Sequence, residues 1–231
     1  MTKESLDARL ASAAEYVRQG AVFADIGTDH AHLPIFLLQS GRIDTAVAAD
    51  IARGPLSRAE ENAKKHNLYE KITFRLTDGL SGLDTLGITD IAICGMGGEL
   101  ISQILDSAPF VKNKEIRLIL QPMSKQDTLR RYLAKNGFAI ISETLSRAAG
   151  RVYSCICAEY TGVPYELTEA RYLVGSPELK NEKDKENYKK LIDKKRVAMQ
   201  KRIDGKNAAG GVDGYAAATL CALDKIRGDI Q

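Results

Sequence analysis

Short apolar segments alternate with amphipathic segments along most of the chain, and this alternation limits the folds open to it. Each apolar segment has the length of a strand, and each amphipathic segment has helical spacing. The predicted strands span residues 21–26, 45–50, 71–77, 90–95, 116–122, 138–144 and 152–160. The predicted helices span residues 5–19, 34–40, 54–67, 98–106 and 125–136. Because strands separated by helices pair in parallel through right-handed crossovers, we predict an α/β fold with a mostly parallel seven-stranded sheet.

The final two strands are joined only by the turn-like sequence SRAAGR, residues 146–151. So short a connection joins antiparallel strands, and we expect a terminal hairpin at the edge of the sheet. Five crossover strands followed by a hairpin is the arrangement of Rossmann-like class I methyltransferases and differs from that of the dinucleotide-binding dehydrogenases.

The composition changes after residue 160, which indicates a second domain. We place the domains at residues 1–162 and 163–231. Residues 178–206 carry 11 Lys and Arg against six Asp and Glu, a local charge of +5; since the whole chain carries +3, the remainder carries −2. The spacing of apolar residues predicts a coiled-coil-like helical hairpin, with a first arm of about 27 residues, and so about 40 Å, and a second helix over 215–227. The concentrated positive charge favours contact with RNA phosphates, and a dimerising coiled coil is the alternative.

The first strand runs into the sequence DIGTDHAHLP, residues 25–34, where a nucleotide-binding fold makes its first turn. A diphosphate needs a turn of the form G-x-G-x-x-G, whose glycines let backbone N–H groups approach the phosphates. This turn has Gly27 but not the other two glycines, and it places Asp29 where the diphosphate would lie. Carboxylates at Asp25 and Asp29 instead favour S-adenosylmethionine, which has no phosphate and carries a sulfonium and an ammonium.

Three further strand ends carry polar or glycine-rich sequences. Asp50 ends the second strand, where an acidic side chain accepts hydrogen bonds from ribose hydroxyls; a helix cap or a solvated strand end is the alternative. Asp78 and Gly79 follow the third strand, where they could meet an adenine amine or simply form a turn. The sequence CGMGGE, residues 94–99, follows the fourth strand, and its glycines allow a ligand close to the backbone.

Two alternatives remain open for charged residues near these strand ends. Asp25, Asp29, His30 and His32 could hold a metal ion, although His32 also suits a helix start and no third histidine is well placed. The helix after the fifth strand carries Arg130, Arg131 and Lys135, which indicate either a solvated face or phosphate contacts.

Taken in order, the sequences ARL, ADIGTDHAHLP, AADI, TDGL, ICGMGGELI and LQPM resemble those of the TrmK-type bacterial tRNA adenine-22-N1 methyltransferases. The resemblance runs to about residue 160, and the basic hairpin behind it is also similar; His32 departs from it, since an aromatic residue is expected there. The resemblance implies methyl transfer from S-adenosylmethionine to N1 of an adenine in the D-arm region of tRNA. The chain has no N/D-P-P-Y/F sequence after the fourth strand, which fits a ring nitrogen better than an exocyclic amine.

The resemblance also implies roles for individual residues. Those expected to bind the cofactor are Asp25, Gly27, Thr28, Asp29, His30, Asp50, Ile51, Asp78, Gly79, Cys94, Gly95, Met96 and Gly97. Those expected to take part in the methyl transfer are Asp29, His30 and Met96, and Tyr153 could help to position the base. Because adenine N1 already has a lone pair, the reaction needs alignment of the reactants more than a general base.

Other function classes make different predictions. A metal-dependent hydrolase would use the Asp25, Asp29, His30 and His32 cluster, and a non-catalytic RNA-binding protein would bind the methyl donor without transferring its methyl group. We expect tRNA as the partner, no obligate protein partner, and a monomer. The four cysteines form no C-x-x-C pair, no signal peptide is evident, and no apolar run reaches the length of about 18 residues of a membrane span, so we expect a cytoplasmic protein.

Overall fold

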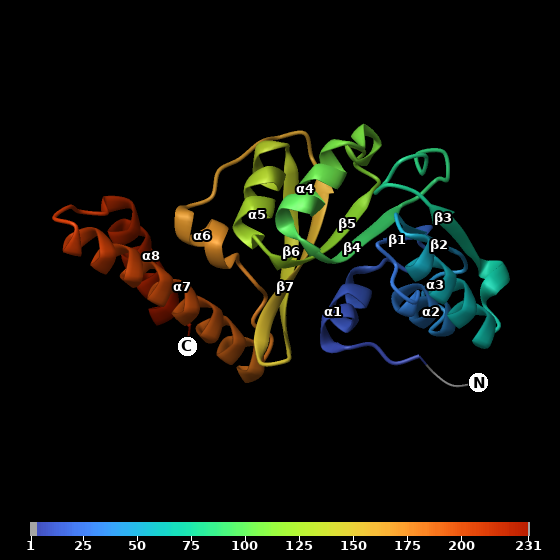
Figure 1. Cartoon of the computed structure of the whole chain (residues 1–231), viewed down its shortest axis with the longest axis horizontal. Coiled ribbons are helices and arrows are strands. Elements are labelled where there is room, and N and C mark those ends of the chain that lie inside the picture. Colours follow the sequence, from blue (N-terminus) through green and yellow to red (C-terminus); the bar gives the residue numbers. More distant parts are fainter. Residues whose placement is uncertain (1–3, 231) are drawn as a thin grey trace.

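The computed structural model describes residues 4–230, and its centre is a seven-stranded sheet (Figure 1). The strands are β1 Phe23–Ile26, β2 Ala46–Asp50, β3 Ile72–Leu76, β4 Asp90–Gly97, β5 Arg117–Ser124, β6 Phe138–Ala148 and β7 Arg151–Tyr160. Their order across the sheet is β3-β2-β1-β4-β5-β7-β6. The pairs among β1 to β5 are parallel, and β7 is antiparallel to both of its neighbours. The predicted fold, with its terminal hairpin, is confirmed.

Helices cover both faces of the sheet, which forms the middle layer of three. The helices are α1 Ala8–Tyr16, α2 His32–Gln39, α3 Arg53–Lys65, α4 Gly98–Asp106 and α5 Gln126–Lys135, with short 3₁₀ turns at Tyr69–Lys71 and Pro109–Val111. Helices α1, α2 and α3 pack on one face, and α4 and α5 pack on the other. This arrangement leaves the carboxyl ends of the parallel strands open at one edge of the sheet. Of the helices within residues 4–230, none has the length and apolarity needed to cross a membrane.

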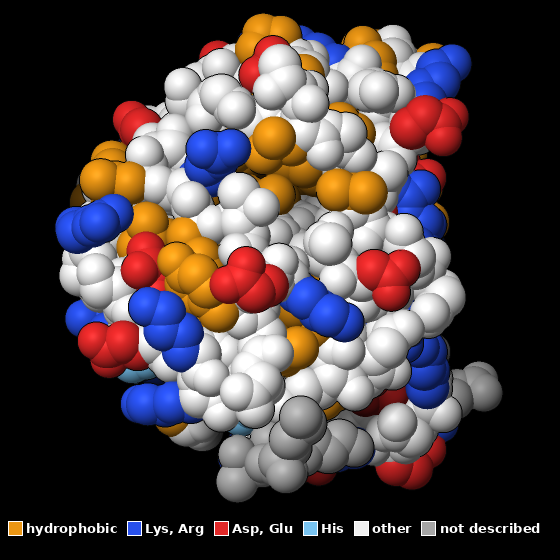
Figure 2. Space-filling view, turned by 90° about the vertical axis from the view of Figure 1, so that its right-hand side faces the viewer, with side chains coloured by type: hydrophobic (Ala, Val, Ile, Leu, Met, Phe, Trp, Pro, Cys, Tyr) orange, Lys and Arg blue, Asp and Glu red, His pale blue; other side chains and the backbone are white. Residues whose placement is uncertain are grey.

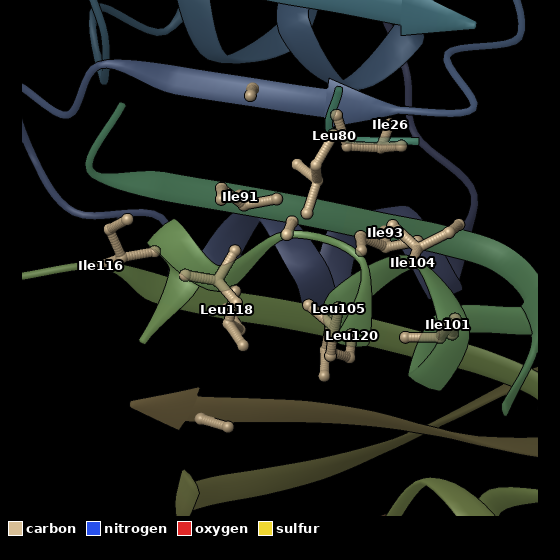
Figure 3. Packing of buried hydrophobic residues seen from close by; sticks show 14 of the residues in the cluster. Ile26, Leu80, Ile91, Ile93, Ile101, Ile104, Leu105, Ile116, Leu118 and Leu120 are labelled. Atoms are coloured by element: carbon tan, nitrogen blue, oxygen red, sulfur yellow. The ribbon is translucent and has the colours of Figure 1, made fainter. Parts of the chain in front are cut away.

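Alternate residues along each central strand enter opposite layers of the core. Ile91 and Ile93 of β4 face α4, whereas Ala92 faces the α1–α3 layer. In β5, Leu118 and Leu120 lie on the α4 side. Figure 3 shows Ile93 beside Ile104 of α4 and Leu120 beside Leu105 of α4. Because both faces are covered, the strands read as almost continuous apolar runs, which is the pattern from which they were predicted.

The β6–β7 hairpin is longer than predicted. The sequence SRAAGR is mostly strand, since β6 continues to Ala148 and β7 begins at Arg151. Only Ala149 and Gly150 form the turn, with φ angles of 47° and 75°. Two successive left-handed residues are those of a type I′ turn, whose twist matches that of the flanking strands. The hairpin tip therefore extends beyond the open edge of the sheet.

The C-terminal region consists of a short helix and the helical hairpin. Helix α6, Glu169–Val174, was not predicted; α7, Glu182–Ala208, and α8, Gly214–Gly228, form the hairpin. Figure 1 shows α7 and α8 projecting from the β6 end of the sheet. Their shared core includes Tyr188, Ile192 and Leu223, and Leu145 of β6 joins it. The hairpin is therefore packed against the edge of the sheet and is not a free appendage.

One buried ion pair connects the sheet, α5 and the segment that leads to α7. The Arg130 Nε donates to Glu143 Oε1 at 2.7 Å, and both side chains are almost wholly buried. A second Arg130 nitrogen donates to the backbone oxygen of Tyr172, and Glu143 accepts from the backbone N–H of Ser176. The prediction that Arg130 lies on a solvated or phosphate-binding face is thus wrong. Arg131 is half-exposed and pairs with Glu169.

Candidate active site

A cavity of about 440 Å³ opens at the carboxyl ends of β1, β2 and β4. Strand β1 pairs with β2 on one side and with β4 on the other, so the strand order reverses there. In open α/β sheets this switch point is where ligands bind, because the loops diverge and leave a crevice. The described residues that line the cavity are Asp7, Arg9, Leu10, Asp25, Gly27, Asp29, His32, Leu33, Asp50, Cys94, Gly95 and Met96.

The turn after β1 has an unusual backbone that shapes one wall of the cavity. Gly27 has φ +74°, and a Cβ there would lie 2.2 Å from Cε of Met96. His30 and Ala31 also have positive φ angles, of 63° and 52°, although neither is a glycine. The side chain of Asn62 donates to the backbone oxygen of His30 at 2.8 Å and so holds this strained turn. Strain of this kind is characteristic of ligand-binding turns.

Asp25 provides a buried carboxylate at the base of the cavity. Its residue is 7% exposed. Burial raises the pKa of Asp25 to about 6, and the neighbouring carboxylate of Asp50 acts in the same direction. A carboxyl group in this state gains most from a ligand that brings a positive charge.

Asp29 and Asp50 lie closer to solvent than Asp25. The Asp29 side chain is 63% exposed, and Arg58 Nη2 donates to it at 3.0 Å, with His30 Nε2 at 3.5 Å. Asp50 accepts the backbone N–H of Ala52 through Oδ1 at 2.8 Å. That contact is an Asx-turn between Asp50 and the second residue after it, and it is not a helix cap, because Ala52 itself occupies the N-cap position of α3. The hydrogen bond to Ala52 does not use the second carboxylate oxygen of Asp50, Oδ2, and Asp50 also lines the cavity.

The structure brings together seven of the thirteen residues expected to bind the cofactor. Asp25, Gly27, Asp29, Asp50, Cys94, Gly95 and Met96 line the cavity. Thr28 is buried within the turn, and His30 stacks on His32. Ile51 is 68% exposed just beyond Asp50. Asp78 and Gly79 follow β3, and Gly97 is the last residue of β4. None of these three residues lines the cavity.

Five lining residues were not expected. Asp7, Arg9 and Leu10 come from the start of α1, and His32 and Leu33 from the start of α2. The sequence ARL contributed to the family resemblance but received no role. Nothing local to residues 7–10 indicates a ligand, because α1 reaches the cavity through its packing on α2 and on strands β4 to β7.

The ends of β4 and β5 form the wall beside Met96. The Gly95 N–H donates to Oε1 of the fully buried Gln121 at 3.2 Å. Met123 follows in the same strand and is 39% exposed. Its sulfur accepts from Arg9 Nη1 at 3.2 Å. Tyr153 lies behind, with the Arg9 guanidinium 5.7 Å above its ring, and is 7% exposed. Arg9 therefore covers the ring that was considered for positioning the base.

The residues considered for a metal site do not converge. His32 begins α2 and directs Nδ1 to Glu4, at 2.7 Å, and His66 Nε2 reaches the same carboxylate at 3.1 Å. Within residues 4–230, no group of three or more His, Cys, Asp or Glu side chains is arranged to hold a metal ion. The interpretation of His32 as a helix-start residue is confirmed, and nothing in this arrangement favours the metal-dependent hydrolase.

The charge of the cavity decides which ligands fit it. Four carboxylates line it, against one arginine and His32. A diphosphate would be repelled by this set, whereas a ligand with cationic groups would be attracted. The nucleotide-type position of the cavity and its acidic lining together match a nucleoside that carries positive charge.

Comparison with known families defines the class. Residues 6–156 match the family model described as a methyltransferase domain, which is more than half of the chain. The chain therefore belongs to the methyltransferases with this domain, as its fold and its switch-point cavity indicate.

Individual relatives define the family more narrowly. The chain is 36% identical, over 159 residues, to the tRNA (adenine(22)-N(1))-methyltransferase of Bacillus subtilis, covering 69% of this chain and 67% of that protein. The crystal structure of the B. subtilis m1A22 tRNA methyltransferase TrmK has a TM-score of 0.79 at 30% identity, covering 99% of this chain and 98% of that one. TrmK of M. capricolum, in complex with S-adenosylhomocysteine, has a TM-score of 0.77 at 26% identity, covering 97% of each chain. This protein is thus a member of the tRNA (adenine-22-N1)-methyltransferase family, and the resemblance found in the sequence is confirmed.

Proposed function

We propose that this protein transfers a methyl group from S-adenosylmethionine to N1 of adenine 22 in tRNA, and that the switch-point cavity holds the methyl donor. The observation that supports this most directly is the acidic lining of that cavity in a chain of this family. The cofactor supplies an activated methyl group on a sulfonium. The cytoplasm, where tRNA is found, is the proposed site of action, and the proposed acting form is a monomer.

Three of the four lining carboxylates receive a distinct part in this proposal. Asp25 at the base pairs with the ammonium of the methionine group, because burial leaves it without a competing water shell. Asp50 accepts the ribose hydroxyls through the carboxylate oxygen that does not accept the Ala52 N–H. Ile51, exposed beside it, packs on the adenine ring of the cofactor. Asp29 faces solvent at the rim, where it can meet the cation that forms on the target base.

The target adenine enters between the ends of β4 and β5. Gly95 and Met96 lie there beside the buried Gln121, whose amide fixes the backbone of Gly95. N1 needs no deprotonation before attack, so these residues act by holding N1 in line with the methyl group. N1 lies on the pairing edge, and the nucleotide must leave its base pair or stack to reach the site.

Mapping of the methylated nucleoside tests the proposed function. Unmodified tRNA incubated with the protein and S-adenosylmethionine should gain one methyl group at N1 of adenine 22, and the same tRNA with guanine at that position should gain none. Methylation elsewhere would contradict the assigned position. Tight binding of tRNA and cofactor without transfer to any tRNA pool would favour the non-catalytic RNA-binding protein, and stoichiometric zinc or manganese would favour the hydrolase.

The helical hairpin offers a basic stripe for tRNA. Its arginines are engaged within the hairpin, since Arg196, Arg227 and Arg202 pair with Asp224, Asp193 and Asp213. Lys183, Lys190, Lys194 and Lys201 are exposed, and Lys190 also pairs with Glu186. Their spacing of seven, four and seven residues places them on one side of α7. They span about 27 Å along the helix. In contrast, Figure 2 shows positive and negative side chains interspersed on the end of the molecule opposite the hairpin.

Replacement of these four lysines by glutamine should weaken tRNA binding and its dependence on salt. Each lysine that pairs with a phosphate releases about one counterion on binding, so the log–log salt slope should become shallower by about 3 if all four lysines contact phosphates. Filter binding at several salt concentrations measures this. The matched control replaces Lys65, Lys71, Lys112 and Lys114, which are also exposed, and should keep the slope. Equal slopes for both variants would exclude the stripe as the tRNA contact.

The affinity for S-adenosylmethionine should rise with pH around 6. Asp25 is protonated below its pKa of about 6 and cannot then pair with the ammonium, so binding at pH 5 should be about tenfold weaker than at pH 7. The stability of the cofactor-free protein should change in the opposite direction. A raised pKa contributes stability that is fully present below the ordinary value near 4 and lost as the pH rises through about 6.

Calorimetry and thermal melting between pH 5 and pH 7 measure the two trends. Asp25→Asn should remove the pH dependence of both the cofactor affinity and the stability. Asp29→Asn should retain both dependences, because the buried carboxylate of Asp25 remains. A flat affinity profile in the unaltered protein would show that Asp25 does not pair with the cofactor.

A further inference from the structure

An exposed ion pair joins the segments that follow β4 and β5. Lys125 Nζ lies 3.6 Å from Glu99 Oε1, and each side chain is 60% exposed. Glu99 is the second residue of α4 and comes three residues after Met96 of the cavity wall. Lys125 directly follows β5. Because the target adenine is proposed to enter between the ends of these two strands, the pair spans the entrance.

The backbone holds the two charged residues beside each other. Lys125 has φ +52°, a conformation that residues with a side chain seldom adopt. Its backbone oxygen lies 2.1 Å from where a Cβ of Gly98 would be, so the glycine lets this turn close against the start of α4. One residue earlier, Gly97 pairs with Ser124. The attraction within an exposed pair is small, so a ligand can replace the contact between Glu99 and Lys125 at little cost in stability.

Each side of the entrance also presents an exposed apolar side chain. Leu100, which follows Glu99, is 47% exposed, and Met123, two residues before Lys125, is 39% exposed. Gly97 between the cavity wall and Glu99 is partly exposed and brings no side chain. An unpaired base has apolar faces and one polar pairing edge. The entrance therefore offers apolar contacts for the faces and a carboxylate for the edge.

The pairing edge of adenine differs from that of guanine in the group that a carboxylate can accept. Adenine carries the N6 amine next to N1, whereas guanine carries the O6 oxygen, which a carboxylate repels. During transfer the bond from sulfur to the methyl group breaks and a bond from N1 to the methyl group forms. The sulfonium becomes a neutral thioether, and its positive charge passes to N1 and N6 of the base. A carboxylate on N6 is therefore bound more strongly in the transition state than before it.

We propose that Glu99 accepts the N6 amine of the target adenine, and that Lys125 releases Glu99 to meet a phosphate of the same nucleotide. This inference rests on the proposed function. Because N1 and N6 lie on one edge of the ring, holding N6 at the entrance turns N1 towards the methyl group in the cavity. Glu99 thus selects adenine and lowers the barrier to its methylation.

Removing the amine from the base and the carboxylate from the protein tests this contact. Purine riboside at position 22 of the tRNA lacks N6 and keeps N1; its N1 is less nucleophilic, but that loss is common to every variant. Glu99→Ala should lower the single-turnover rate on adenine tRNA roughly 10- to 100-fold, the range for a charged hydrogen bond. On purine tRNA it should stay within about twofold of the unaltered protein. Glu99→Gln keeps an acceptor oxygen without the charge and should fall between; it also serves if the alanine variant is unstable.

Binding of the two tRNAs in competition, with S-adenosylhomocysteine present, gives the same comparison without depending on the reactivity of N1. The unaltered protein should prefer the adenine tRNA, and Glu99→Ala should bind the two tRNAs equally. Lys125→Gln should weaken both by the same factor, because the phosphate is common to them.

Asp127→Ala provides a matched control. Asp127 is the second residue of α5, as Glu99 is of α4, so its removal also takes an acidic group from the first turn of a helix. It should change the rates on the two tRNAs by the same factor. Equal losses on both tRNAs in Glu99→Ala, or an unchanged rate on adenine tRNA, would overturn the inference. If the unaltered protein did not methylate the adenine tRNA, the proposed function itself would fail.

Discussion

Glu143→Ala should lower the free energy of unfolding by about 3–5 kcal/mol, because it leaves the guanidinium of Arg130 buried without its counter-charge. Arg130 cannot turn to solvent, since it is also bound by the backbone of Tyr172 and by Ser154 at 3.3 Å. The substitution also removes the acceptor for the Ser176 N–H. Urea denaturation of the unaltered and substituted proteins measures the loss.

Two further variants test whether the loss of stability arises from leaving a charge buried without its partner. Glu169→Ala breaks the pair with Arg131 at the surface, where both side chains are about 40% exposed, and should cost no more than about 1 kcal/mol. The double variant Arg130→Met, Glu143→Leu replaces both buried charges by apolar groups and should recover much of the stability. If Glu143→Ala cost no more than Glu169→Ala, the buried pair would not stabilise the fold.

The position of Arg130 shows what the sequence could and could not predict. The buried residues of α5 are Gln126, Leu129, Arg130, Leu133 and Ala134, so helical spacing alone places Arg130 within the apolar stripe. A charged residue was instead assigned to the outside, because arginines are seldom fully buried without a partner. That partner is Glu143, in the next strand, and local periodicity carries no information about such a pair.

Some residues of the candidate site could likewise be predicted from the sequence, and others could not. Residues at the ends of β1, β2 and β4 were predicted correctly to meet, because parallel strands bring their carboxyl ends to one edge of the sheet. Arg9 was missed, because its contact with Met123 spans 114 residues and depends on how α1 packs. The Asp29–Arg58 pair likewise joins the first turn to α3, and the sequence of either segment gives no sign of it.

Gly98→Ala should reduce stability by about 3 kcal/mol, at the upper end of the cost of overpacking a core. Gly98 is buried at the start of α4, and a Cβ there would lie 2.1 Å from the backbone oxygen of Lys125. Lys125 has φ +52° in the turn between β5 and α5, and this backbone cannot rotate away as a side chain could. The glycines of the sequence CGMGGE were expected to let a ligand approach the backbone. At Gly98, the space that a side chain would fill is occupied by the backbone of the turn between β5 and α5.

The same collision should impair catalysis, because displacing the turn after β5 also shifts the strand end that carries Gln121 and Met123. A misplacement of about 1 Å beside the reacting groups can reduce the rate about 100-fold. Gly97→Ala is the control for stability, since its Cβ would meet only the side-chain oxygen of the exposed Ser124, at 3.3 Å. Denaturation and single-turnover methyl transfer measure the two effects. A Gly98→Ala protein as stable as Gly97→Ala would show that the β5–α5 turn yields to the added methyl group.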